Sequence, residues 1–190
     1  KSIGAKTGVI PNFAEVPSYS LANGKMILTV ARLSHVKGID ILLKVAKEIL
    51  HNNHEWKWKI IGDGEMKKQV NEFHQKEKME RLILEEPSSP NLESEYRNAS
   101  IYVMTSRNEC FPMVLQEAMS YGVPCIAFDC ETGPRHIINN SEDGFLVPGE
   151  NVEEMIKKIQ LLINDEDKRK KMSLAAHQNI KRFSSETIYS

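Results

Sequence analysis

Short apolar runs rich in β-branched residues recur along the chain and predict strands. Amphipathic stretches separate these runs; in residues 38–50, for example, apolar side chains recur every three or four positions, so they share one stripe of a helix. Strands that alternate with helices favour a parallel sheet with right-handed crossovers and helices on both faces. The five predicted strands cover residues 25–31, 56–62, 81–85, 100–106 and 124–129.

The helical period predicts six helices along the same chain. This α/β alternation indicates a Rossmann-like parallel sheet, and we interpret residues 1–190 as a single domain. Ligands of such sheets bind beyond the carboxyl ends of the strands, at the loops that lead into helices. The predicted helices cover residues 38–50, 65–78, 91–98, 112–121, 151–164 and 165–182.

Charge and cysteine content narrow the class of protein. Lys and Arg number 25 against 26 Asp and Glu, so the net charge of -1 offers no basic field for nucleic acid. The 3 cysteines are odd in number and lack metal-ligand spacing, which favours free thiols and a cytoplasmic location. No apolar run approaches the roughly 20 residues of a membrane span. The chain starts without methionine and ends on a helical pattern, so we expect a fragment of a longer protein.

Two cations follow the first predicted strand, in the segment ARLSHVKGID. Arg32 and Lys37 precede a helix start, where free backbone amides and the helix dipole favour an anion. Arg offers a bidentate fork and Lys a point charge, so the pair suits a diphosphate. Taken alone, the two side chains fit a solvated loop equally well. The segment matches neither G-x-G-x-x-G nor the Walker pattern, so it supports neither a dinucleotide site nor an NTPase phosphate loop.

The second predicted strand ends in the segment IIGDGEM. Gly62 and Gly64 permit a tight turn and close approach of the backbone to a ligand. A turn from strand to helix needs glycines for the same reason, so this signal does not discriminate between the two interpretations.

Two acids flank a proline-started helix in the segment SRNECFPMVLQEAM. Pro112 suits the first helical position, which leaves the amides of Met113 and Val114 open to phosphate oxygens. Glu117 lies roughly 7 Å along the helix, about the separation between the phosphates and the ribose of a nucleotide. A carboxylate can accept hydrogen bonds from both ribose hydroxyls, and Glu109 would face the group beyond the diphosphate. Two glutamates taken at random would be exposed surface residues. Glu109 and Glu117, however, lie on either side of a helix start, and the loop with Arg32 and Lys37 precedes them, so we favour a binding site.

Together these segments resemble the C-terminal donor-binding domain of the retaining GT-B nucleotide-sugar glycosyltransferases of glycosyltransferase family 4. The resemblance spans residues 9–182. It is carried by VIPNF, ARLSHVKGIDILL, IIGDGE, SRNECFPMVLQEAMSYGVPCIAFD with its two spaced glutamates, and EDGFLVP. It implies that the chain forms one half of a GT-B fold.

The resemblance also implies roles for the site residues. Arg32 and Lys37 would neutralise the donor diphosphate without a metal or other cofactor, Glu109 would contact the donor sugar, and Glu117 would bind the ribose. Glu109, Arg32 and Lys37 would then form the catalytic set. The remaining donor-binding residues would be Phe111, Pro112, Met113, Val114, Gly62 and Gly64.

The segment ETGPRHII is similar to a variant of family members that use UDP-sugars in polysaccharide and glycan assembly. The implied donor is therefore UDP-hexose or UDP-N-acetylhexosamine. The acceptor, a sugar or a lipid-linked sugar, would bind through an N-terminal domain that this sequence lacks. We therefore expect a hexosyltransferase half that is inactive, or nearly so, in isolation.

Two departures from the family pattern leave alternatives open. His136 stands where many members have glutamate, and the segment at residues 85–91 replaces a glycine-containing strand end beside the base. A sugar-nucleotide epimerase of the same architecture and a non-catalytic scaffold module are the alternatives. The Lys-rich final helices predict a solvated face, or contact with anionic lipid at the inner face of a membrane.

Overall fold

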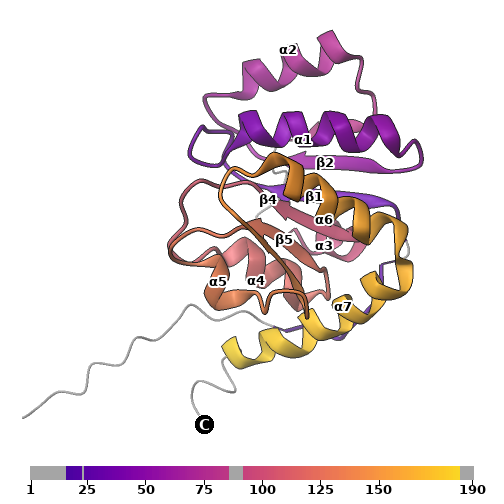
Figure 1. Ribbon diagram of the computed structural model, residues 1–190, viewed down its shortest axis with the longest axis vertical. Helices are drawn as coiled ribbons and strands as arrows, with labels where there is room; N and C mark the ends of the chain where they lie inside the picture. The colour runs from indigo at the N-terminus through magenta and orange to yellow at the C-terminus, as the bar shows by residue number, and fades with distance from the viewer. Residues whose placement is uncertain (1–15, 23, 86–91, 185–190) are drawn as a thin grey trace, which may run out of the picture.

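A computed structural model describes residues 16–22, 24–85 and 92–184, and Figure 1 shows its central sheet. The sheet has six strands in the order β3-β2-β1-β4-β5-β6, and each neighbouring pair is parallel. The chain leaves β1 towards one edge and continues from β4 towards the other, so the topological switch point lies between these two strands. The strands are β1 Met26–Val30, β2 Lys57–Ile61, β3 Leu82–Glu85, β4 Ile101–Met104, β5 Cys125–Phe128 and β6 Gly144–Val147.

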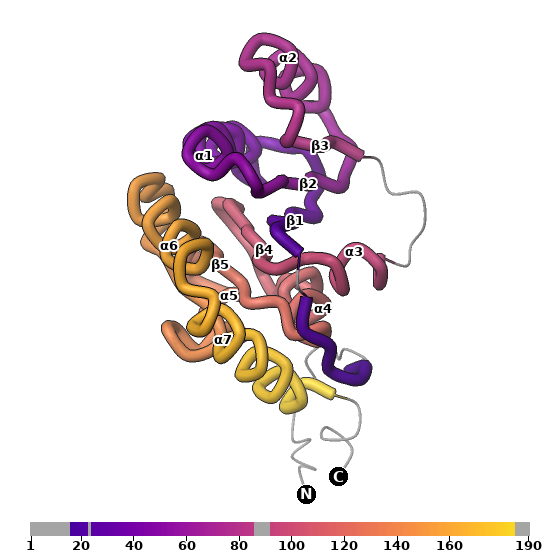
Figure 2. The backbone as a smooth tube through the Cα atoms, turned by 90° about the vertical axis from the view of Figure 1, so that its right-hand side faces the viewer, coloured from indigo at the N-terminus to yellow at the C-terminus, as the bar shows by residue number. Residues whose placement is uncertain are grey.

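Helices cover both faces of the sheet, as the alternating pattern predicts. In Figure 2, α1 and α6 lie on one side of the strands and α3 and α4 on the other. The Rossmann-like α/β class is therefore confirmed. The helices are α1 Ile39–Asn52, α2 Lys67–Glu77, α3 Glu93–Asn98, α4 Met113–Ser120, α5 Pro134–Ile137, α6 Val152–Asn164 and α7 Glu166–Asn179, and the 3-10 helix η1 Ile180–Phe183 follows α7.

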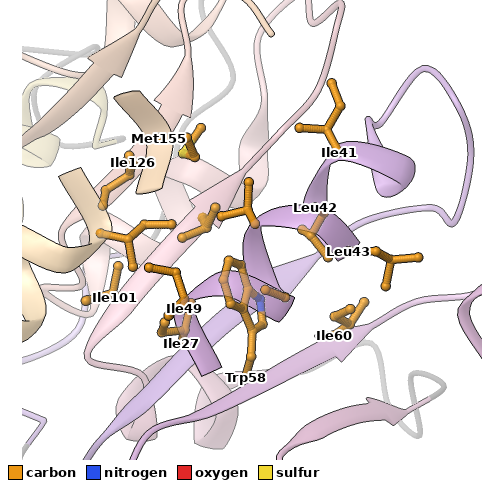
Figure 3. Packing of buried hydrophobic residues seen from close by; sticks show 14 of the residues in the cluster. Ile27, Ile41, Leu42, Leu43, Ile49, Trp58, Ile60, Ile101, Ile126 and Met155 are labelled. Atoms are coloured by element: carbon orange, nitrogen blue, oxygen red, sulfur yellow. The ribbon is translucent and has the colours of Figure 1, made fainter. Parts of the chain in front are cut away.

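Two hydrophobic clusters fill the spaces between the sheet and the helices. The larger one contains the α1 stripe and the fully buried Trp58 (Figure 3). Its indole N–H donates to Thr29 Oγ1 at 3.1 Å, and the Thr29 hydroxyl donates to the Val103 carbonyl at 2.8 Å. The polar atoms buried with this large ring are therefore hydrogen-bonded. On the opposite face, Tyr102 and Leu115 belong to the second cluster, which seats α4 against β4 and β5.

Two elements are missing from the sequence prediction. The segment EDGFLVP, to which no strand was assigned, contains the edge strand β6, and α5 forms one helical turn within ETGPRHII. Gly144 and Pro148 border β6 and are typical of turns, and the 4 residues of α5 are too few to show a helical period. The predicted helix over 165–182 also ends earlier, at Asn179, and continues as η1. Among the residues that the structure describes, no helix combines the length and the apolar character needed to cross a bilayer.

Candidate functional site

A cavity of about 520 Å³ opens at the carboxyl ends of β1, β2 and β4. It lies at the switch point of the sheet, where open α/β sheets bind ligands, and its volume suits a small molecule. The loop after β1 contributes Arg32 and Lys37, the turn after β2 contributes Gly62 and Asp63, and the segment after β4 contributes Ser106, Glu109, Phe111, Pro112, Met113 and Val114.

The end of β4 holds the loop that carries Lys37. Gly38 caps α1 in the left-handed conformation, with φ of 66°, and a Cβ there would lie 1.9 Å from the Thr105 carbonyl oxygen. The Thr105 hydroxyl donates to the carbonyl oxygens of Lys37 and Gly38, at 3.2 and 3.0 Å. A glycine is therefore needed for the α1 loop to pack so closely against β4.

Lys37 and Glu109 meet at the cavity although 72 residues separate them. Lys37 Nζ donates to Glu109 Oε1 at 2.7 Å, and the hydroxyl of the buried Ser106 donates to the same oxygen at 2.7 Å. The side chain of Glu109 is 10% exposed, so its carboxylate is fixed in a largely desolvated position. Sequence reasoning missed Ser106, whose only signal is its place three residues before Glu109.

Arg107 joins the Lys37 loop to the Glu109 loop. Its guanidinium donates to both carboxylate oxygens of Asp40, at 2.8 and 2.9 Å, and to the His35 carbonyl at 2.6 Å. The hydrogen bonds from Arg107 hold the pKa of the Asp40 carboxyl below its usual range. Sequence reasoning missed Arg107 because its partners are distant along the chain.

Arg32 lies at the open rim of the cavity. Its side chain is 73% exposed, and its guanidinium is 3.5 Å from a carboxylate oxygen of Glu65. An exposed ion pair of this length holds its partners weakly, so Arg32 is free to turn towards a ligand in the cavity.

The helix start at α4 forms one wall of the cavity. Pro112 is the residue before the helix, with an extended ψ of 109°, so the prediction that it takes the first helical position is wrong by one residue. The first intrahelical hydrogen bond runs from the Leu115 N–H to the Pro112 carbonyl at 3.2 Å. The N–H groups of Met113 and Val114 precede that bond and belong to residues that line the cavity.

Two predicted site residues, Glu117 and Gly64, lie outside the cavity lining. Glu117 follows Val114 by about one turn of α4 and accepts a hydrogen bond of 2.7 Å from the hydroxyl of the buried Tyr96. Gly64 serves the backbone, since a Cβ there would lie 2.5 Å from the Leu33 carbonyl oxygen. Gly62 lines the cavity but has the same constraint, because its Cβ would lie 1.9 Å from the Ala31 carbonyl oxygen.

The remaining candidate side chains do not line the cavity. His136 is exposed on α5, Cys110 is exposed, and burial raises the pKa of the thiols of Cys125 and Cys130. All three cysteines are free, as predicted from their number and spacing.

Within residues 16–22, 24–85 and 92–184, no group of three or more His, Cys, Asp or Glu side chains could hold a metal ion.

The sheet order and the cavity define an α/β domain with a cavity of ligand size at the carboxyl ends of its parallel strands. The chain belongs to the family described as Glycosyl transferases group 1, whose model matches residues 16–179. AmsD of Erwinia amylovora, an amylovoran biosynthesis glycosyltransferase, is 37% identical over 162 residues, which are 85% of this chain and 45% of AmsD.

Solved structures share the fold. A TarM mutant of S. aureus, in complex with fondaparinux, α-GlcNAc-glycerol and UDP, superposes with a TM-score of 0.89 at 25% identity, over 96% of this chain and 38% of TarM. The C-terminal domain of the group 1 glycosyl transferase LpcC from Francisella tularensis superposes with a TM-score of 0.74 at 23% identity, over 84% and 86% of the two chains. The fold is therefore the Rossmann-like half of a GT-B protein. The chain spans about half the length of the curated relatives it matches.

Proposed function

We propose that the chain is the donor-binding half of a retaining glycosyltransferase. The sugar would pass from UDP-hexose or UDP-N-acetylhexosamine to an acceptor hydroxyl during polysaccharide or glycan assembly. One observation carries the proposal: Lys37, Glu109 and the start of α4 converge on one cavity at the switch point of the sheet.

The diphosphate would lie between the cations and the start of α4. Lys37 is held at the cavity and Arg32 is exposed at its rim, so together they can neutralise two phosphates from two sides. The amides that open α4 add donors directed along the helix axis, and the helix dipole favours an anion there. In this arrangement the backbone at Phe111 and the helix start at Met113 and Val114 would contact the phosphates and the sugar.

The two glutamates would bind the groups on either side of the diphosphate. The hydrogen bonds to Glu109 both go to Oε1, so Oε2 is available for a sugar hydroxyl or for positive charge that develops at the anomeric carbon. Glu117, further along α4, would take the ribose hydroxyls, with its Oε2 already held by Tyr96. UDP as the nucleotide is supported by its presence in the TarM complex.

The acceptor would bind to a second α/β domain that completes the cleft. This part of the proposal is supported by the chain's coverage of 45% of AmsD and 38% of TarM. Because a transfer site needs both walls, the isolated chain should bind the donor and transfer its sugar very slowly or not at all.

Isothermal titration of the chain with UDP, UDP-glucose and UDP-N-acetylglucosamine tests the donor site. Lys37→Ala should weaken binding at least about tenfold, because it removes a partly desolvated charged donor. Lys57→Ala is the matched control: Lys57 is exposed at the opposite end of β2 and should leave affinity unchanged. Absence of binding by the wild-type chain, or equal binding by the Lys37 variant, would reject the proposal.

The catalytic assignment needs the longer protein. There, Glu109→Ala should mainly slow transfer, whereas Glu117→Ala should mainly weaken donor binding. Donor conversion without any acceptor would indicate the epimerase alternative, and donor binding with neither reaction would indicate a scaffold.

A further inference from the structure

Glu109 is placed to compete with a diphosphate for Lys37. Its Oε1 lies 2.7 Å from Lys37 Nζ, and the Lys37 side chain, 30% exposed, is one of the cations that would bind the phosphates. A carboxylate so close to the phosphate-binding cation weakens the positive potential that a diphosphate meets. Because Glu109 is largely desolvated, solvent and salt screen this effect less than at an open surface.

Three contacts prevent Glu109 from turning away. Ser106, itself 1% exposed, and Lys37 both hold Oε1, and the Thr132 hydroxyl donates to the Glu109 carbonyl at 2.6 Å. The negative charge is therefore fixed beside the phosphate position, since both the side chain and its backbone are held.

We propose that Glu109 selects against the bare nucleoside diphosphate and so favours its release after the sugar has left. This inference rests on the proposed function. Free UDP has a terminal phosphate that can carry one more negative charge than the diphosphate of a UDP-sugar, so the fixed carboxylate repels UDP more strongly. The donor sugar of a UDP-sugar also offers hydroxyl groups that would hydrogen-bond Glu109 and offset the repulsion, whereas UDP lacks this sugar.

The test compares the affinities of UDP and UDP-sugars for the wild-type chain and Glu109→Gln. Glutamine keeps the shape and an oxygen acceptor but removes the charge. We expect UDP to bind about 3- to 10-fold more tightly to the variant, whereas UDP-glucose and UDP-N-acetylglucosamine bind no more tightly than to wild type. Glu109→Ala should change UDP affinity in the same direction, which guards against a local effect of the glutamine amide.

Glu65→Gln is the matched control. It also removes one carboxylate paired with a site cation, but that pair is 3.5 Å long and exposed, so the gain in UDP affinity should be much smaller. An equal gain in UDP affinity for Glu65→Gln and Glu109→Gln would show that the effect depends only on the net charge of the protein, and it would overturn the inference. UDP binding by Glu109→Gln that is no tighter than wild type, while wild type binds both ligands, would overturn the inference alone. Absence of wild-type binding to every nucleotide would instead reject the proposed function, and the inference with it.

Discussion

Arg107 grips Asp40 through two parallel hydrogen bonds, of 2.8 and 2.9 Å, and so fixes the loop after β4 against the first turn of α1. The Arg107 N–H adds a bond of 2.8 Å to the Val36 carbonyl, and its guanidinium lies 3.3 Å from Glu150. The partners of Arg107 lie on both sides of Lys37 in the sequence, and Arg107 itself precedes Glu109 by two residues. The contacts of Arg107 therefore hold the Lys37 loop and the Glu109 loop in fixed positions relative to each other.

Arg107→Ala should lower the free energy of unfolding by about 1–2 kcal/mol, because a bidentate, partly buried ion pair and a bond to a carbonyl are lost. Urea denaturation measures this change. Arg135→Ala, which removes a single 2.9 Å bond to Asp129 from a more exposed guanidinium, is the control and should cost less. Lysine at position 107 should restore only part of the loss, because it cannot form the fork. Full recovery with lysine would show that charge alone suffices.

The Arg107–Asp40 pair should also make stability depend on pH. Its hydrogen bonds lower the pKa of Asp40 in the folded protein below the ordinary value of 3.8. The stabilisation is therefore complete above the unfolded pKa and is lost as pH falls through the folded one. The difference in unfolding free energy between wild type and Arg107→Ala should be constant near neutral pH and shrink below about pH 4. A difference that grows on acidification would contradict the ion-pair account.

Gly38→Ala should destabilise the protein by about 2 kcal/mol or more. The new Cβ would stand 1.9 Å from the Thr105 carbonyl oxygen, and the left-handed backbone adds strain for any residue with a side chain. Gly149→Ala is a suitable control, because a Cβ there meets nothing within 4 Å. Thermal or urea unfolding of the two variants gives the comparison. Similar stabilities would mean that the α1 loop does not pack on β4 as described.

The pattern of apolar residues predicted the layers of the fold, because buried positions recur with the period of a helix or a strand. The α1 stripe and the strand around Trp58 are identifiable for this reason. Strand β6 was missed because Gly144 begins it and Pro148 follows it, and both residue types are typical of turns. Helix α5 was missed because its 4 residues are too few to show a helical period. The parallel topology allowed loops after β1 and β4 to be assigned to one edge, and the structure brings Lys37 and Glu109 together there.

Other parts of the site could not be predicted, because they depend on contacts between distant segments. No local pattern connects Arg107 with Asp40, or Tyr96 with Glu117, since each pair forms only when separate elements pack. The same limit explains why Glu117 was expected to line the site. Helix geometry fixes the position of Glu117 along α4, but it does not predict the hydrogen bond from Tyr96 that orients the Glu117 carboxylate.

Asp143 should give the opposite pH dependence. It is 1% exposed between the turn before β6 and α7; the Asn139 N–H donates to Oδ1 at 2.8 Å, and Asn179 Nδ2 donates to Oδ2. Burial outweighs these bonds and raises the pKa of Asp143 to about 6. The folded protein therefore binds the proton more readily than the unfolded chain, so this group lowers stability as pH rises from about 4 to about 6.

Asp143→Asn removes that ionisation. Relative to wild type, the variant should gain on the order of 1–2 kcal/mol between pH 4 and pH 7, in addition to any constant offset from the altered hydrogen bonds. Urea denaturation at steps of one pH unit measures the trend. A relative loss over the same range would mean that the carboxylate is stabilised by its partners.

Tyr96→Phe should weaken UDP binding through Glu117. The Tyr96 hydroxyl donates to Glu117 Oε2 at 2.7 Å, and the ring is 2% exposed and stacked on Tyr121, so phenylalanine can keep the packing while freeing the carboxylate. On the proposed role of Glu117, binding the ribose would then have to order that side chain, at a cost of about 1 kcal/mol or roughly fivefold in affinity.

The readout that separates positioning from packing is the affinity for UDP relative to 2′,3′-dideoxy-UDP, which lacks the hydroxyls that Glu117 would bind. Tyr96→Phe should reduce this preference for UDP, and Glu117→Ala should remove it, so that the two nucleotides bind with about equal affinity. Tyr19→Phe, which removes a hydroxyl bonded to Ser173 on α7, should leave the ratio unchanged. Equal weakening of both nucleotides by Tyr96→Phe would show that Tyr96 only supports the α3–α4 packing, because loss of packing does not distinguish a ribose with hydroxyls from one without them.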